Sequence, residues 1–440
     1  MKTTVSASSS ALRLFRTPLR HAPSFIVFSV LAMSFSLLFA SEMDARMESL
    51  RKRSDSGDLK ARLELANLYF QGAEGVPRDF SKAFTLYESS AKAGNASALF
   101  NVGLCYETGR GVERDPAKAF ECYKKAAAAG VPQAVFNLGI CYKTGVRDAK
   151  GKPVYPPDPL KAEDCFSKLC SMKFIPAYRE MAGLLFLRGG EKNDKKGYSL
   201  LKTAAAHGDA VAMRLLADCH RYGKGCPQNI PESVEWLRKS AEAGSAEAMA
   251  KLAYCFERGE GVAPDASKAA RYWRMAAEAN LPAAQHKLGA LYAAGDLGFP
   301  QDLGKAKKWF RKAADGGNAK GFFSLGLMAL EGLGDEKNVE KGVALILAAA
   351  KLGEPHAQFN MGTFYSQGKG VEKNPEKAFF WYANAAAQGD PKGMREIGFA
   401  FLQGKGTKKD FKKGMAFLAK AAERGDSAAR RFLMDVTPRK

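Results

Sequence analysis

The strongest constraint on this chain is a pattern that returns about every 36 residues. The segment Ala98–Gly130, which reads ALFNVGLCYETGRGVERDPAKAFECYKKAAAAG, can be aligned with nine other stretches of the chain. The ten copies begin near residues 61, 98, 134, 177, 212, 248, 284, 321, 357 and 393. One insertion, between Gly145 and Leu160, interrupts the spacing. A period of this length predicts tandem copies of one supersecondary unit.

Each copy is predicted to form two helices joined by a turn. Counting the first residue as position one, position five is apolar and position six is Gly or Ala in every copy, as at Val102 and Gly103. Apolar residues at positions one, five and eight give a helix with one buried stripe, and the small residue lets a second helix approach closely. A glycine such as Gly109 then ends the first helix, and an Asp or Asn such as Asp115 caps the second.

Neither helix of a pair can bury its stripe alone, so successive copies must stack on one another. We therefore predict an all-α fold, a right-handed α/α superhelical solenoid of about ten helix-turn-helix repeats, over residues 58–433. The register breaks in the fourth copy, where Arg188 precedes Gly189.

The repeated string resembles a known family. It reads A-x-x-x-L-G-x-x-Y-x-x-G-x-G-V-x-x-D-x-x-K-A-x-x-W/Y-x-x-K-A-A-x-x-G and is nearly complete at Ala98–Gly130, Ala248–Ala279 and Ala357–Gly389. This pattern is similar to the Sel-one-like repeat, a relative of the tetratricopeptide repeat. The resemblance implies a solenoid that serves as a protein-binding scaffold or adaptor, in exported bacterial proteins or in the endoplasmic reticulum.

The amino end has the pattern of an export signal. Residues 1–24 carry four basic residues and no acid, and the uncharged run Phe25–Ala40 follows, with Ala40 at the candidate cleavage position. We predict a cleaved signal peptide, with an uncleaved signal anchor as the alternative, and therefore a periplasmic or extracellular location. The expected segments are residues 1–40 for the signal, 41–57 for a linker or N-terminal cap, 426–433 for a closing helix and 434–440 for a tail.

A partner-binding groove is predicted on the first helices, at the positions opposite their buried stripe. Positions three and four there carry phenylalanines beside amide side chains, an unusual choice for a solvated surface. The candidate residues are Phe100, Asn101, Phe136, Asn137, Phe323, Phe359 and Asn360. They suggest two patches that bind a protein or peptide in the concave groove. The alternative is that these rings pack on each other or on the next copy.

The formal net charge of +21 favours anionic partners. Many of the basic residues lie on the second helices, where the plain interpretation is a solvated outer face. Attraction to an anionic envelope surface, such as acidic lipid or cell-wall polymer, is the other interpretation. A pentatricopeptide RNA binder has a similar period but lacks the Gly-x-Gly-Val turn, so we expect no nucleic acid.

The eight cysteines and five histidines give no metal-binding spacing. Four of the cysteines occupy position eight, a core position. Cys122 and Cys141 lie equally far from the turn at Val131 and Pro132, so antiparallel packing would place them opposite each other. They are the best candidates for a disulfide if the chain is exported.

No catalytic set stands out. Some exported relatives are described as β-lactamase-like, and four S-x-x-K strings occur here, beginning at Ser49, Ser89, Ser199 and Ser366, with Lys143-Thr144-Gly145 elsewhere. Their scattered positions are what chance gives in a Lys-rich chain. We therefore predict a non-enzymatic scaffold without a cofactor or metal; the alternatives are a β-lactamase-like envelope hydrolase and a protein that binds cell-wall or other anionic polymer.

Overall fold

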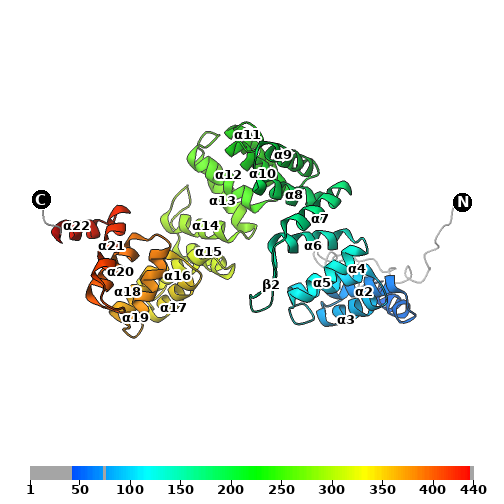
Figure 1. Cartoon of the computed structure of the whole chain (residues 1–440), viewed down its shortest axis with the longest axis horizontal. Helices are drawn as coiled ribbons and strands as arrows, with labels where there is room; N and C mark the ends of the chain where they lie inside the picture. Colours follow the sequence, from blue (N-terminus) through cyan, green and yellow to red (C-terminus); the bar gives the residue numbers. More distant parts are fainter. Residues whose placement is uncertain (1–41, 73–75, 437–440) are drawn as a thin grey trace, which may run out of the picture. The chain divides into compact units, whose positions relative to one another are not determined.

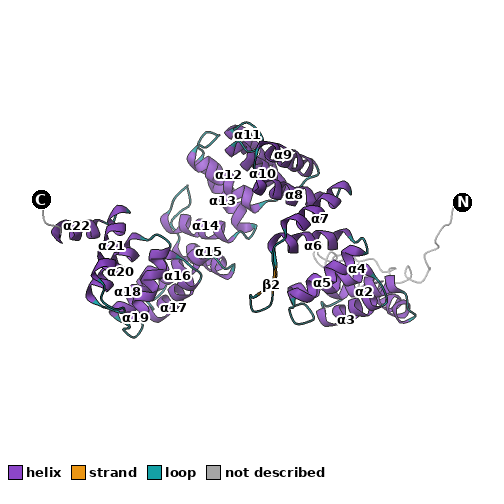
Figure 2. Ribbon diagram, in the orientation of Figure 1, coloured by secondary structure: helices purple, strands orange, loops and turns teal. Residues whose placement is uncertain are grey.

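The computed structural model describes residues 42–72 and 76–436, which form two units divided between Leu184 and Leu185. Both units are built from antiparallel helix pairs (Figures 1 and 2). The predicted signal segment, residues 1–40, lies outside the described residues, as does most of the predicted tail.

The first unit begins with helical residues 42–55, whose Met47 and Leu50 are buried in one cluster with Leu65 and Tyr69. The following helices are α2 (Leu59–Gln71), α3 (Phe80–Lys92), α4 (Ala96–Thr108), α5 (Pro116–Ala128), α6 (Pro132–Thr144) and α7 (Pro159–Ser171). Helix α8 (Ile175–Arg188) begins in this unit and ends in the second.

The second unit continues the same alternation of first and second helices. Its helices are α9 (Glu191–Ala206), α10 (Ala210–Tyr222), α11 (Ile230–Glu242), α12 (Ala246–Arg258), α13 (Ala266–Glu278), α14 (Pro282–Ala294), α15 (Leu303–Asp315), α16 (Ala319–Glu331), α17 (Val339–Lys351), α18 (Pro355–Gln367), α19 (Pro375–Ala387), α20 (Pro391–Gln403), α21 (Phe411–Glu423) and α22 (Ser427–Val436). The predicted closing helix corresponds to α22, which packs on α21.

The helix boundaries follow from the capping residues that recur in the sequence. Asp115 adopts an extended conformation and its carboxylate accepts a hydrogen bond from the Lys118 backbone N–H, which begins α5. Gly109 ends α4 in the left-handed conformation, with φ 70°. The same pairing of an Asp or Asn cap with a terminal glycine recurs in most copies, as the pattern predicts.

Close helix packing explains the small residue at position six. A Cβ added to Gly103 would lie 2.6 Å from the Tyr123 ring, and one added to Gly362 would lie 2.5 Å from the Tyr382 ring. The buried core therefore runs along each unit as a series of clusters, in which the second helix of one copy also contacts the first helix of the next. The all-α solenoid of about ten repeats is confirmed.

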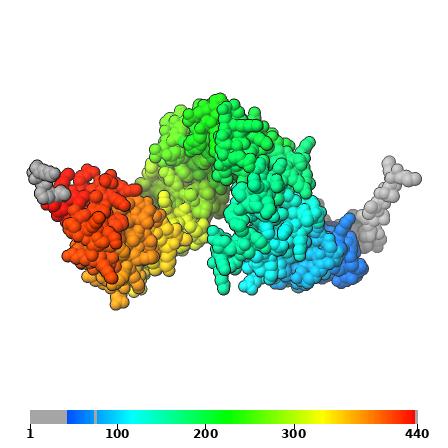
Figure 3. Space-filling model, viewed as in Figure 1, coloured from blue at the N-terminus to red at the C-terminus, as the bar shows by residue number. Residues whose placement is uncertain are grey.

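The insertion between α6 and α7 forms a small departure from helical structure. Strands β1 (Val146–Arg147) and β2 (Pro153–Tyr155) pair antiparallel, and Tyr155 packs on Phe120 with ring centroids 4.3 Å apart. The hairpin stands out from the surface of the first unit (Figure 3). Helices α6 and α7 on either side of it keep the 13-residue length of most helices in the array.

Candidate functional site

The predicted partner-binding residues lie on one face of the first helices, which we call the groove face and define by positions three, four, seven and ten of each copy. The first unit contributes Phe100 and Asn101 on α4 and Phe136 and Asn137 on α6; the second contributes Phe323 on α16 and Phe359 and Asn360 on α18. All seven are half-buried. Part of each side chain is therefore available to a ligand, and part belongs to the packing of the array.

The phenylalanines lie against rings of neighbouring helices. The Phe100 ring centroid is 5.8 Å from that of Tyr123, on the second helix of the same copy. Phe359 makes the equivalent contact with Tyr382 at 5.6 Å. The structure thus shows the internal packing that was the alternative expectation from the sequence. Each ring packs on its neighbour and is still half-buried, so part of its surface is exposed.

The other two phenylalanines also have ring partners. Phe136 lies 5.8 Å from Phe166 and 5.7 Å from Phe174, measured between centroids. Phe323 lies 6.2 Å from His356 of the following copy. Substitution at these positions will therefore perturb packing as well as any ligand contact.

Polar bridges join the first helices of successive copies across the groove face. Lys287 Nζ lies 3.0 Å from Glu257 Oε1, and the other oxygen of Glu257 accepts a hydrogen bond from Trp273 Nε1 at 3.0 Å. Lys143 Nζ lies 2.8 Å from Glu180 Oε2. These bridges run from position four of one copy to position ten of the preceding copy.

Further bridges use position seven or position three of the preceding copy. Lys251 Nζ lies 2.5 Å from Asp218 Oδ1, and His286 Nε2 lies 3.1 Å from Ser324 Oγ. This ladder was not predicted from the sequence. The signal was present, because residues of opposite charge stand at position four of one copy and position seven or ten of the copy before.

Two cavities open beside the groove face, one in each unit. The first, of about 500 Å³, lies between copies two and three, and its walls include Glu107, Tyr123, Ile140 and Thr144. The second, of about 430 Å³, lies between copies nine and ten, with Ser366, Tyr382, Glu396, Phe399 and Gln403 in its walls. The wall of each cavity includes a tyrosine from a second helix, Tyr123 or Tyr382, on which one of the predicted partner-binding phenylalanines packs.

The first cavity contains a strong hydrogen bond. Tyr123 Oη donates to Glu107 Oε2 at 2.5 Å. Burial raises the pKa of Tyr123, and the hydrogen bond to Glu107 and the charge of that carboxylate raise it further. Tyr123 therefore stays protonated at physiological pH and donates to Glu107, which shares the cavity wall with Arg114, Arg147 and Asp148.

In the S-x-x-K string that begins at Ser89, the serine and the lysine have separate partners. Ser89 Oγ accepts a hydrogen bond from Arg62 Nη1 at 3.1 Å, while Lys92 Nζ lies 2.9 Å from Glu88 Oε2. Lys143 of the K-T-G string is the lysine that pairs with Glu180. The structure thus gives these residues roles in helix packing and ion pairing.

All eight cysteines lie within the described residues and are free thiols, in contrast to the predicted Cys122–Cys141 disulfide. The two side chains pack in different surroundings. Cys122 Cβ lies 3.2 Å from the place where Gly103 would carry a Cβ, while Cys141 lines the cavity with Glu107 and Tyr123. The structure therefore does not join the two thiols.

Neither a metal-binding cluster nor a membrane-spanning helix occurs in the part of the chain that the structure describes. Residues 42–72 and 76–436 contain no group of three or more His, Cys, Asp or Glu side chains placed to hold a metal ion. The same segments contain no helix with the length and apolar character needed to cross a membrane.

Comparison with known proteins identifies the repeat. The Sel1 repeat matches ten times, at residues 59–95, 96–131, 132–174, 175–209, 210–245, 246–281, 282–318, 323–354, 355–390 and 391–426. The search of curated proteins gave no significant match.

Solved structures agree with the repeat assignment. A protective antigen of uropathogenic Escherichia coli strains, which displays an SLR fold, is 32% identical, with a TM-score of 0.52 over 89% of this chain and 82% of the other. A Sel1 repeat protein from Oxalobacter formigenes is 25% identical, with a TM-score of 0.50 over 56% of this chain and 96% of the other. With ten matches that together span most of its length, this chain belongs to the Sel1 repeat family.

Proposed function

We propose that this chain is an exported, non-enzymatic scaffold that binds a protein or peptide partner along the groove face. Sel1 repeat proteins are typically scaffolds for protein–protein interactions, which gives the general class. The observation that carries the specific proposal is the pair of cavities beside the groove face, each bordered by aromatic and polar side chains.

The cavities suit a peptide because they combine apolar walls with fixed polar groups. Ile140 and Phe399 offer apolar surface, while Glu107 and Glu396 can accept hydrogen bonds from backbone N–H groups or pair with a basic side chain. Half-buried rings also lose little conformational freedom when a partner covers their remaining surface. Export rests on the amino-terminal sequence pattern alone.

The test is affinity purification from the native cell, with the full chain as bait. The variant Phe100→Ala, Phe136→Ala, Phe359→Ala should lose a partner that the unchanged chain retains. Phe380→Ala is the matched control, because Phe380 on α19 is 56% exposed and lies off the groove face. Circular dichroism must show that both variants keep their helices.

A second variant separates binding from packing. Asn360→Arg leaves every phenylalanine in place but adds bulk and charge to the groove face of α18, and it should also release the partner. If both groove variants retain every protein that the unchanged chain captures, the groove face is not the binding surface.

A further inference from the structure

At most junctions between successive copies, an aromatic ring at position nine of the first helix fills the space; copy four has Leu185 there and copy eight has Ala329. In copy two this ring is Tyr106, and Lys118 Nζ lies 5.4 Å from its centroid and 3.4 Å from Asp115 Oδ2. The lysine is thus held between a ring and the carboxylate that caps its own helix. The same lysine-over-ring contact joins Lys82 to Tyr69, Lys161 to Tyr142, Lys268 to Phe256, Lys305 to Tyr292, Lys377 to Tyr365 and Lys413 to Phe401.

At three junctions a phenylalanine of the preceding second helix also meets the position-nine ring. The pairs and their centroid distances are Phe84–Tyr106 at 5.5 Å, Phe120–Tyr142 at 5.6 Å and Phe379–Phe401 at 5.4 Å. All three are edge-to-face contacts, which stabilise beyond the apolar area that they bury. The preceding second helix, the ring and the lysine together fill the junction.

Copy eight keeps the lysine, as Lys341, but lacks both rings and the capping carboxylate. Ala329 stands at position nine, Lys307 takes the place that Phe84 has in copy one, and the second helix is capped by Asn338 instead of Asp. The backbone is nevertheless unchanged, because Asn338 N–H donates to Ala329 O at 2.8 Å just as Asp115 N–H donates to Tyr106 O. Only the side chains that fill the junction differ.

A cavity of about 280 Å³ lies at this junction, between α15, α16 and α17. Its apolar lining is formed by Phe322, Leu325, Met328 and Leu345, with Ala329 beside them. An apolar cavity of about 150 Å³ is enough to bind benzene. The junction therefore has room for an aromatic ring together with a small polar group.

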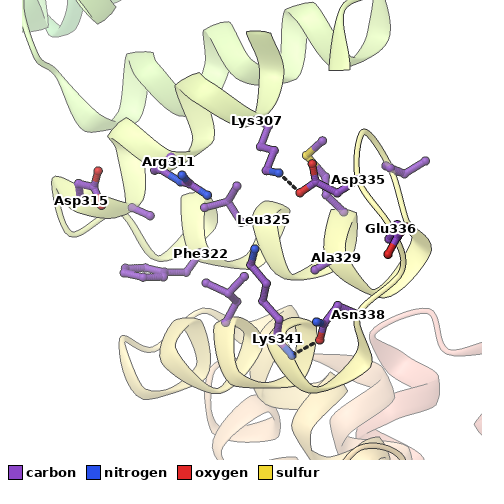
Figure 4. Close-up of a pocket in the computed structure, with 14 residues that line it drawn as sticks. Lys307, Arg311, Asp315, Phe322, Leu325, Ala329, Asp335, Glu336, Asn338 and Lys341 are labelled. Carbon is purple, nitrogen blue, oxygen red and sulfur yellow. Dashed lines mark hydrogen bonds and ion pairs between the residues drawn. The ribbon is translucent and has the colours of Figure 1, made fainter. Parts of the chain in front are cut away.

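Three cationic side chains converge on this cavity (Figure 4). Lys307 and Arg311 reach it from α15 and Lys341 from α17. Lys307 pairs with Asp335, but among the described residues Arg311 and Lys341 form no ion pair. The two remaining acidic groups of the lining, Asp315 and Glu336, lie at opposite edges of the view, away from the converging cations.

The positive charges around the cavity affect the pKa of Lys307. Burial lowers the pKa of Lys307, and the charges of Lys341 and Arg311 lower it further. A carboxylate placed between Lys341 and Arg311 would reduce this repulsion. The lysine that elsewhere sits between a ring and a carboxylate would then have both partners again.

We propose that this cavity binds the carboxyl-terminal residue of a partner polypeptide, with an aromatic side chain on the apolar lining and the terminal carboxylate between Lys341 and Arg311. The ligand would supply both groups, ring and carboxylate, that six other junctions provide from within the chain. The peptide source rests on the proposed scaffold function. The site itself does not depend on that function, because it lies away from the groove face. Phe322, Leu325 and Ala329 line it, and they lie on the side of α16 opposite to Phe323 and Ser324.

The test is isothermal titration of the full chain with defined ligands. The probe is the peptide acetyl-Ala-Ala-Ala-Phe with a free carboxylate, compared with the same peptide amidated at its end, with acetyl-Ala-Ala-Ala-Ala and with free N-acetylphenylalanine. The free-acid Phe peptide should bind. The affinity of the amide and that of the all-Ala peptide should each be lower by a factor of about ten or more.

Two variants and one control locate the site. Ala329→Tyr restores the ring found at the other junctions and should abolish binding while the chain stays folded. Lys341→Gln should weaken binding about tenfold, because it removes a charge-assisted contact. Lys377→Gln is the control at the next junction, where Tyr365 is present, and it should leave binding unchanged.

Several results would overturn the proposal. They are no measurable binding of the Phe peptide, equal binding of acid and amide, or unchanged binding by folded Ala329→Tyr. Binding of N-acetylphenylalanine as tight as that of the peptide would assign the cavity to a small aromatic acid and reject a polypeptide ligand. Loss of partners from the groove-face variants has no bearing on these titrations, so the two proposals can fail separately.

Discussion

The second glycine of the Gly-x-Gly turn offers the sharpest test of how the copies fit together. Gly406 has φ 70°, and a Cβ there would lie only 2.1 Å from the Pro375 carbonyl oxygen of the preceding second helix. Gly334 has nearly the same conformation, φ 77°, but its nearest neighbour would be Leu303 Cβ at 3.6 Å. The two sites share backbone strain and differ in contact between copies.

Alanine substitution at both sites separates these effects. The left-handed conformation costs alanine roughly 1–2 kcal/mol, and the reduced freedom of the unfolded chain offsets about 0.4–1 kcal/mol of that. Gly334→Ala should therefore destabilise by about 1 kcal/mol. Gly406→Ala must also displace backbone, which adds about 1–3 kcal/mol by analogy with overpacked cores.

Hydrogen exchange of the full chain is the suitable assay, because an array of repeats need not unfold in one step. We expect the amides of α19 and α20 to lose protection in Gly406→Ala by an amount about 1–3 kcal/mol larger than the loss around Gly334 in Gly334→Ala. Guanidinium unfolding followed by circular dichroism gives an independent comparison. Equal losses in the two variants would refute the account of turn packing between copies.

Three further predictions concern a histidine, two thiols and the hairpin. Burial lowers the pKa of His286, so only the unfolded state takes up a proton on this histidine as the pH falls below about 6.5. The free energy of unfolding should therefore be flat above that pH and fall below it. Denaturation between pH 5 and 8 should show a smaller fall in His286→Asn. Thiol titration of the denatured, unreduced chain should find all eight thiols, whereas six would indicate the Cys122–Cys141 disulfide predicted from sequence. Tyr155→Ala removes a ring contact and the 3.0 Å hydrogen bond to Glu121. Hydrogen exchange should show that the amides of β2 lose about 1–2 kcal/mol of protection in this variant and less in Tyr155→Phe. Equal loss of protection in both variants would mean that the hydroxyl alone holds the hairpin.

The sequence predicted those features of the fold that repeat and act locally. The small residue at position six could be recognised without a structure, because all ten copies have Gly or Ala there. The contact that a Cβ at Gly103 would make with the Tyr123 ring explains this choice. Cap residues such as Asp115 also act within four residues of themselves. The hairpin could be recognised only as an insertion, since it occurs once and has no second example to compare.

Features that depend on the rotation between helices could not be predicted. Whether the Phe100 ring faces solvent or packs on Tyr123 depends on where the second helix lies across the first, which the period does not specify. The Cys122–Cys141 prediction failed to match the structure for the same reason. The cavity at Ala329 was not predicted, although the sequence carries its signal: position nine holds a ring in every copy except the fourth and the eighth.

The measurement that tests the central claim most directly is site-specific photo-crosslinking in the native cell. A photoreactive phenylalanine analogue is placed at Asn137, on the groove face of α6, and in a separate chain at Phe380, on the exposed surface of α19. The account predicts that one partner protein is captured repeatedly from Asn137 and not from Phe380. Capture of that partner only from Phe380 would contradict it.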